Sequence, residues 1–227
     1  MSRSAFARSR RPSNPNLPIY ILLVGMVALI VVVLLILPGL SSGPGVVIPT
    51  PLPRPASIDN TLGDPSAPVR VEEFADFQCP FCRRFVEEIE PRLILEYVEP
   101  GVVFFVYRQF PVLGAPSVRA AEASLCARDQ GAFWAYHDVL YLNQDETNPQ
   151  AFSDSRLLEF ANGISLDSGA FSTCVDQRRF AGEVQADAQA ALSAGLNATP
   201  SFIINGRSLV GLVSYGEFAQ LLEEALP

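Results

Sequence analysis

The chain contains one Cys-x-x-Cys motif, within the stretch Phe77-Gln78-Cys79-Pro80-Phe81-Cys82. A strand-like run, 69–75, precedes it, and a helical pattern that reaches about Tyr97 follows it. A motif at this junction places two sulfurs at the N-terminus of a helix, where free N–H groups and the helix dipole favour a thiolate. The pattern therefore predicts Cys79 as the nucleophile and Cys82, deeper in the helix, as the resolving cysteine.

Two other kinds of site use cysteines at this spacing. A zinc site needs four Cys or His ligands, usually as two close pairs, but Cys126 and Cys174 are far apart and His137 is the only histidine. An inert disulfide between Cys79 and Cys82 would close a small ring, which gives little entropic stabilisation. Redox chemistry is therefore favoured, and it needs neither a metal nor an organic cofactor.

Length and charge limit the classes of function. The 227 residues are enough for one domain with appendages, and they carry 24 acidic residues against 16 arginines and no lysine. A net charge of −8 argues against a nucleic-acid partner, because phosphates require cations. The acidic surface is best interpreted as solvation.

The N-terminal region predicts a membrane anchor. Ile19–Leu37 is a run of 19 residues without a charge, long enough to cross a bilayer as a helix. A cluster of arginines before it predicts a basic cytoplasmic tail, 1–17, a transmembrane helix, 18–38, and an extracytoplasmic location for the rest. A cleaved signal peptide is the alternative, with Ser41-Ser42-Gly43 as a weak cleavage point.

A Pro/Gly-rich stretch, 39–56, predicts a semi-extended linker, so that the folded domain occupies 57–227. Four cysteines in that domain fit an oxidising compartment. They suggest two pairs, Cys79 with Cys82 and Cys126 with Cys174. The second pair would close a long loop and add roughly 4 kcal/mol of stability, which makes it structural. A second redox couple there is less favoured, because neither cysteine lies in a motif.

The patterns within the domain alternate between strand and helix. In 69–75, Glu73 shares one face with three apolar residues, so a role for a buried carboxylate competes with an edge position open to water. Pro91 should kink the helix that follows the motif. A buried strand at 102–107 precedes a helical segment, 117–179. A helix, a hairpin around Asn205-Gly206 and a last helix complete the domain.

This order of elements resembles the thioredoxin fold with an inserted helical domain, preceded here by one transmembrane helix. The residues are similar to those of the DsbA-type thiol:disulfide oxidoreductases, over about Ser57 to the C-terminus. The likeness rests on three stretches: Glu73-Phe74-Ala75-Asp76-Phe77-Gln78-Cys79-Pro80-Phe81-Cys82-Arg83-Arg84, Phe133-Trp134-Ala135-Tyr136-His137-Asp138 and Ala198-Thr199-Pro200-Ser201-Phe202.

The resemblance implies further roles. Thr199-Pro200 should have a cis peptide bond, face the active cysteines and bind substrate. Glu73 matches a buried acid that could relay a proton to Cys82. Pro80 and Phe81 lie between the cysteines and should tune them. Phe81 departs from the strongest oxidases of the family, which have a histidine there, and the helix terminus with Arg83 and Arg84 could compensate.

Three functions follow. The favoured one is a membrane-anchored oxidase of reduced or unfolded client proteins outside the cytoplasm, which a quinone-linked membrane partner would reoxidise, as the family implies. A reductase or isomerase would run the same chemistry in reverse. A tethered chaperone or binding module would hold clients beside Pro200 without chemistry. His137, on an aromatic-rich helix, is interpreted as a packing or surface residue, and Trp134 as part of the core.

Overall fold

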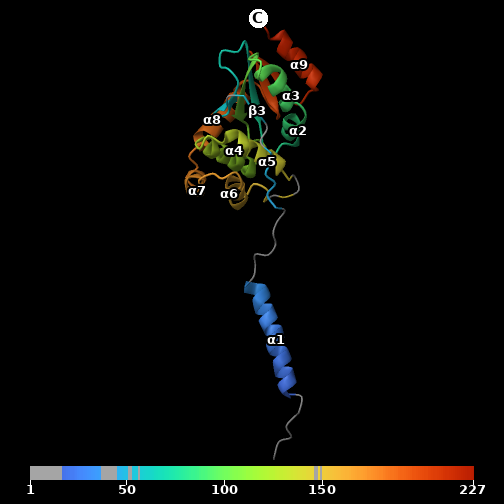
Figure 1. Ribbon diagram of the computed structural model, residues 1–227, viewed down its shortest axis with the longest axis vertical. Helices are drawn as coiled ribbons and strands as arrows, with labels where there is room; N and C mark the ends of the chain where they lie inside the picture. The colour runs from blue at the N-terminus through green and yellow to red at the C-terminus, as the bar shows by residue number, and fades with distance from the viewer. Residues whose placement is uncertain (1–16, 37–44, 51–52, 56, 146–147, 149) are drawn as a thin grey trace, which may run out of the picture. The chain divides into compact units, whose positions relative to one another are not determined.

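The computed structural model describes residues 17–36, 45–50, 53–55, 57–145, 148 and 150–227 (Figure 1). The chain divides into two compact units, Met1–Gly45 and Val46–Pro227. The first contains α1 (Leu17–Ile36). In the part of the chain that is described, no helix is both long and apolar enough to cross a membrane. Of the predicted tail, linker and anchor, residues 1–16, 37–44, 51–52 and 56 lie outside the described residues.

A six-stranded mixed sheet forms the centre of the second unit, with the strand order β1-β2-β4-β3-β5-β6. The strands are β1 (Ser57–Ile58), β2 (Thr61–Leu62), β3 (Val69–Ala75), β4 (Val103–Gln109), β5 (Ser201–Ile204) and β6 (Arg207–Val210). The central pair β3 and β4 is parallel, and the remaining pairs are antiparallel. A parallel pair requires a crossover, which the helices after the motif supply. The sheet, with its parallel central pair joined through helices, agrees with the predicted α/β architecture.

The helical segment after the motif is broken where the sequence predicts a kink. It consists of α2 (Pro80–Glu88), α3 (Glu90–Leu93) and the π-helical turn η1 (Ile94–Val98). Pro91 lies in the first turn of α3, where its missing N–H costs nothing. The break at Ile89 starts a new helix, and its first residue, Glu90, is fully buried.

Four helices form the insertion after β4, in the segment that the sequence predicts as helical. They are α4 (Ala115–Arg128), α5 (Phe133–Leu142), α6 (Asp154–Gly163) and α7 (Ser168–Asp176). A disulfide joins Cys126 of α4 to Cys174 of α7, across 48 residues of sequence. It fixes the two ends of the insertion to each other.

The remaining helices, α8 (Ala181–Ser193) and α9 (Tyr215–Glu224), cover opposite faces of the sheet (Figure 1). Phe85 of α2 lies 4.8 Å from Phe202 of β5 and 5.7 Å from Phe218 of α9, between ring centroids, so α2 and α9 share one face. On the other face, Phe74 of β3 packs in a small cluster with Ala191 of α8. Successive residues of β3 therefore point to different layers, and Glu73 faces the α2 side.

Residues 46–50 and 53–55, which belong to the predicted linker, pack on the domain. We call these residues the N-terminal strap. The Val47 N–H donates to Asn143 Oδ1 at 2.9 Å, and Asn143 Nδ2 donates to the Val47 carbonyl at 2.7 Å. Ile48 contacts the position where a side chain at Gly163 would begin. The compact unit that contains the sheet begins at Val46.

Candidate active site

The two motif cysteines begin helix α2, as the sequence predicts. Cys79 is the N-cap residue with an extended backbone, and Pro80 takes the first helical position, which its fixed φ suits. Both cysteines are free thiols, with 5% of Cys79 and none of Cys82 exposed. Within the described residues, no group of three or more His, Cys, Asp or Glu side chains could hold a metal ion.

The two thiols have opposite acidities. A hydrogen bond from the Cys82 side chain lowers the pKa of Cys79 to about 6, against the effect of burial, and Thr199 and the backbone N–H groups of Cys82 and Phe81 contribute. Burial raises the pKa of Cys82 well above 9.0, and the neighbouring Cys79 and Glu73 add to that rise. One sulfur is therefore a stable thiolate near neutral pH, while the other strongly prefers its proton.

The loop before β5 faces the reactive sulfur. The Thr199–Pro200 peptide bond is cis, as the resemblance implies. The Cys79 thiol donates a hydrogen bond to the Thr199 carbonyl at 3.2 Å, across 120 residues of sequence. The Pro200 carbonyl accepts from the Gly211 N–H at 2.9 Å, which joins this loop to the end of β6. The sequence-predicted cysteines and Thr-Pro pair are thus brought together.

Glu73 lies fully buried in β3, so it does not occupy an edge position open to water. Its partners across the sheet are Tyr107 of β4 and Phe202 of β5. Burial, then the charge of Glu90 and then that of Cys79, raise the pKa of Glu73 well above 4.5. Neither carboxylate oxygen has a hydrogen-bond partner among the described residues. Glu73 is therefore protonated over a wide pH range, and close enough to Cys82 to influence its pKa.

Two polar residues that sequence reasoning did not identify hold the motif in place. The Asp76 carboxylate accepts from the N–H groups of Gln78, Val112 and Leu113 at 2.8 to 2.9 Å. The Gln144 amide donates to the carbonyls of Phe77 at 2.8 Å and Cys79 at 3.1 Å. The only sequence signal for Asp76 is its place between the strand and the motif, and Gln144 gives none.

A groove of about 450 Å³ lies beside the motif. Half of Phe81 is exposed at its edge, Leu212 and Val213 line it from the segment between β6 and α9, and Tyr215 lines it from the start of α9. Its walls are mixed, with Arg84 and Glu88 on the α2 side. A side chain of a bound polypeptide could therefore rest there while its neighbour reaches Cys79.

A family described as thioredoxin matches residues 57–224, which covers the sheet, the motif and every helix of the second unit. The chain belongs to this thioredoxin family, as a DsbA-type member.

Two named proteins have sequences similar to that of this thioredoxin-family chain. It is 30% identical to the probable disulfide bond formation protein D of Bacillus anthracis, over 66% of this chain and 71% of that protein. It is 37% identical to Na(+)/H(+) antiporter NhaA 3 of Salinispora tropica, over 66% of this chain. The matched part spans only 22% of the antiporter.

A solved structure extends the likeness to three dimensions. Oxidised BdbD from Bacillus subtilis has a TM-score of 0.69 and 26% identity, and the match covers 76% of this chain and 95% of that one. A thioredoxin-like oxidoreductase from Silicibacter pomeroyi has a TM-score of 0.62 and 30% identity, over 73% and 90% of the two chains.

The thioredoxin-family site departs from the prediction at the arginines beside the motif. Arg83 pairs with Glu87 at 2.7 Å, and Arg84 pairs with Glu88 at 3.2 Å, each one turn along α2. Their charges are thus engaged away from Cys79. The thiolate is held instead by Cys82, Thr199 and the helix N-terminus.

Proposed function

We propose that the chain is a thiol:disulfide oxidoreductase that oxidises cysteine pairs of client proteins outside the cytoplasm. The observation that carries this proposal is the unequal pair of thiols, with the pKa of Cys79 lowered to about 6 and that of Cys82 raised. A thiolate of low pKa is a good leaving group, so a disulfide that contains it oxidises other thiols readily. The relatives named for disulfide bond formation support this direction.

The reaction proceeds in two exchanges. A client thiolate attacks the Cys79 sulfur of the Cys79–Cys82 disulfide, and the Cys82 sulfur leaves and takes up a proton. A second client thiolate then attacks the client sulfur of the mixed disulfide, and Cys79 leaves as a thiolate. The client gains a disulfide, and the enzyme is left with two reduced cysteines.

Clients bind in an extended form beside the cis-proline loop in this proposal. The Thr199 carbonyl already accepts a hydrogen bond from Cys79, which places a polar backbone group next to the reacting sulfur. An extended client segment can pair with such backbone groups whatever its sequence. The groove at Phe81, which has both apolar and charged walls, would then take a client side chain, which suits unfolded proteins of many sequences.

We further propose that residues 18–38 anchor the enzyme in the cell membrane, with residues 1–17 in the cytoplasm. The uncharged run Ile19–Leu37 and the arginines before it support this topology. A quinone-linked membrane protein is the proposed reoxidant, on family resemblance. Membrane fractionation of the full chain, with alkylation of a cysteine placed at Ser2 or Ser57 by an impermeant reagent, tests the topology.

A redox titration against glutathione tests the direction of the reaction. An oxidase should show a midpoint potential well above that of thioredoxin, about −270 mV. A value near thioredoxin's would instead assign a reductase. The Cys82→Ala variant should trap clients as mixed disulfides at Cys79, and the Cys79→Ser variant should lose all exchange. A tethered chaperone without chemistry would keep its activity in Cys79→Ser and trap nothing.

A further inference from the structure

A set of buried titratable side chains extends from the active site towards the N-terminal strap. Glu73 of β3, Glu90 of α3 and His137 of α5 are each fully buried. Both oxygens of Glu73, Oε2 of Glu90 and Nε2 of His137 have no hydrogen-bond partner among the described residues. Buried polar atoms in proteins are normally bonded, and internal water commonly supplies the bond. Buried unpaired atoms of this kind are suited to bound water and proton transfer.

Short distances join the outer members of this set, His137, Glu90 and Asp138. The charge of Glu90 acts on Glu73. His137 Nε2 lies 3.9 Å from Glu90 Oε2, and its Nδ1 lies 3.0 Å from Asp138 Oδ1. An imidazole can accept a proton at one nitrogen and release one from the other. A carboxylate thus faces each nitrogen of the ring, one on the active-site side and one towards the surface.

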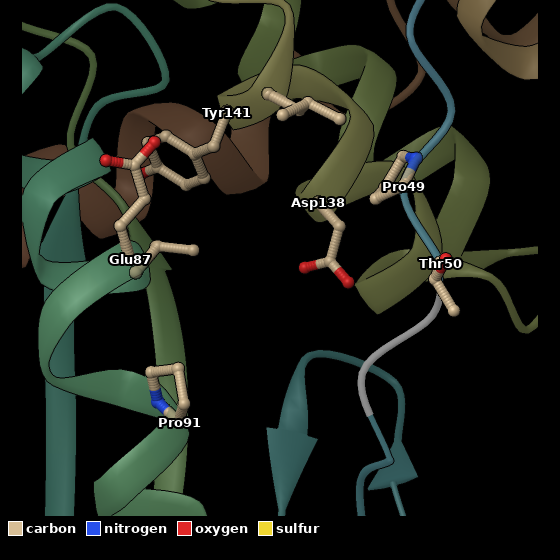
Figure 2. A pocket seen from close by; sticks show the side chains of 8 residues that line it. Pro49, Thr50, Glu87, Pro91, Asp138 and Tyr141 are labelled. Atoms are coloured by element: carbon tan, nitrogen blue, oxygen red, sulfur yellow. The ribbon is translucent and has the colours of Figure 1, made fainter.

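The outer end of the set opens into a pocket. Asp138 lines a cavity of about 280 Å³ together with Pro49 and Thr50 of the strap and with Pro91 of α3. Figure 2 shows the Asp138 carboxylate pointing into this cavity, while Tyr141, from the same helix, lies next to Glu87. Asp138 is therefore the group through which buried His137 communicates with water.

Arg54 of the strap fixes the positions of the acids. Its guanidinium donates to both Asp138 oxygens at 2.7 Å and to Glu90 Oε1 at 2.8 Å. Only 7% of its side chain is exposed. Because one planar cation binds both carboxylates, the free Oε2 of Glu90 remains directed towards His137. Arg54 never touches a reacting atom, so it is a positioning residue.

The other titratable groups around this set hold their protons. Tyr107 of β4, opposite Glu73, and Tyr141 of α5 share a hydrogen bond of 2.9 Å between their hydroxyls. Burial raises the pKa of both tyrosines well above 10.0. Cys79 and Cys82 face Glu73 from α2. Glu73, Glu90 and His137 are therefore the groups left to exchange a proton with Cys82.

The proposed exchange reaction requires such a path. When a client thiolate breaks the Cys79–Cys82 bond, the electron pair stays on the Cys82 sulfur, which then needs one proton. Protonated Glu73 can donate it, and is left as a carboxylate. Because Glu73 is fully buried, it cannot regain the proton from solvent directly. One proton must cross the interior for each turnover.

We propose that Glu90 and His137 carry this proton between the Asp138 pocket and Glu73, with Arg54 holding the path in order. The inference rests on the proposed exchange activity and applies equally to the reverse reaction, in which the proton leaves Cys82. One proton taken from water at Asp138 balances the one delivered to the Cys82 thiolate. The proton path leaves the two sulfur exchanges of the proposed reaction as they are described above.

Chemical rescue of the full chain tests the path. Oxidised His137→Ala is mixed with a reduced dithiol peptide at pH 7, and mixed-disulfide formation is followed by rapid acid quench. We expect a rate at least about tenfold below the parent's, at the low end of general acid–base effects. Imidazole should restore the rate, because it fills the space and carries protons. Pyrazole has the same shape but is far less basic, and should not.

Two further variants complete the test. Tyr136→Phe is the matched control, since Tyr136 is a buried neighbour on α5 whose hydroxyl bonds to Leu157 outside the path. Its rate should equal the parent's. If His137→Ala does not fold, His137→Phe, which keeps the ring volume, should show the same loss. A parent-like rate in both His137 variants, or equal rescue by pyrazole, overturns the proton path. A parent that exchanges no disulfides overturns the proposed function and this inference with it.

Discussion

At the scale of single residues, Cys79 is held as a thiolate by hydrogen bonds rather than by a charged neighbour. Its pKa is lowered first by Cys82 and then, against burial, by Thr199 and two backbone N–H groups. All of these donors and dipoles are fixed by the fold. The acidity of Cys79 therefore depends on the geometry of the α2 terminus and not on the arginines that follow the motif.

That acidity predicts the alkylation profile of the reduced protein. The rate of modification by iodoacetamide should rise with pH to a half-maximum at about 6, because only the thiolate reacts. Mass spectrometry should place the label on Cys79 alone, since Cys82 is buried and holds its proton. A Cys79→Ser variant should take up no label below pH 8. A midpoint near 9.0, the ordinary value for a cysteine, would contradict the arrangement.

A substitution at Phe81 should make the Cys79–Cys82 disulfide a stronger oxidant. It is half-exposed next to Cys79, so a histidine there can be accommodated without disturbing the core. In Phe81→His, an imidazolium near the sulfur should lower the pKa of Cys79 below 6 and raise the midpoint potential, by roughly 30 mV for each tenfold gain. Glutathione titration measures it, with Phe81→Leu as the uncharged control. An unchanged potential in Phe81→His would show that position 81 does not affect the thiolate.

The sequence could predict those parts of the site that depend on local pattern. The Cys-x-x-Cys spacing identifies both thiols, and the alternation of β3 places Glu73 with buried residues. Asp76 and Gln144 could not be found in this way. Asp76 binds N–H groups 36 and 37 residues away, and Gln144 binds carbonyls 65 and 67 residues away. Such contacts arise only once the insertion has packed against the motif.

At the scale of elements, the strap shows that amino-acid composition alone does not tell a flexible linker from a packed segment. Prolines and glycines are typical of linkers, yet residues 46–50 and 53–55 are part of the folded unit. The decisive residue is Arg54, whose partners Glu90 and Asp138 lie 36 and 84 residues later. Nothing in the neighbourhood of Arg54 indicates this pairing. His137, interpreted from the sequence as a packing or surface residue, is fully buried and lies 3.9 Å from Glu90.

Removal of the Arg54 charge should destabilise the domain. In Arg54→Met, two buried carboxylates lose their cation, which costs about 3 to 5 kcal/mol of the free energy of unfolding. Urea denaturation of the oxidised protein measures the loss. Arg70→Met is the matched control, because Arg70 is half-exposed in its pair with Glu72 and should cost at most about 1 kcal/mol. Equal stability of the two variants would mean that the strap is dispensable.

At the scale of the whole molecule, the fold couples its stability to its redox state. The reduced protein has a folded pKa of about 6 at Cys79, against 9.0 for an ordinary cysteine. Between these values the unfolded chain binds more protons than the folded one, so the free energy of unfolding rises with pH. This stabilisation is complete above pH 9 and is lost as pH falls through 6. The oxidised protein has no thiol to titrate and lacks it.

The difference between the two redox forms isolates this effect. Glu73 acts in the opposite sense, because a raised pKa stabilises at low pH and the benefit is lost as pH rises, but its two largest causes, burial and the charge of Glu90, are present in both forms. Cys82 also acts in the opposite sense, because its raised folded pKa removes stability as the pH approaches the ordinary cysteine value of 9.0, so the comparison is made below pH 8. The free energy of unfolding of the reduced form, minus that of the oxidised form, should therefore increase from pH 6 to 8. Urea titrations across this range measure it, and a flat difference would show that the folded protein does not stabilise the Cys79 thiolate.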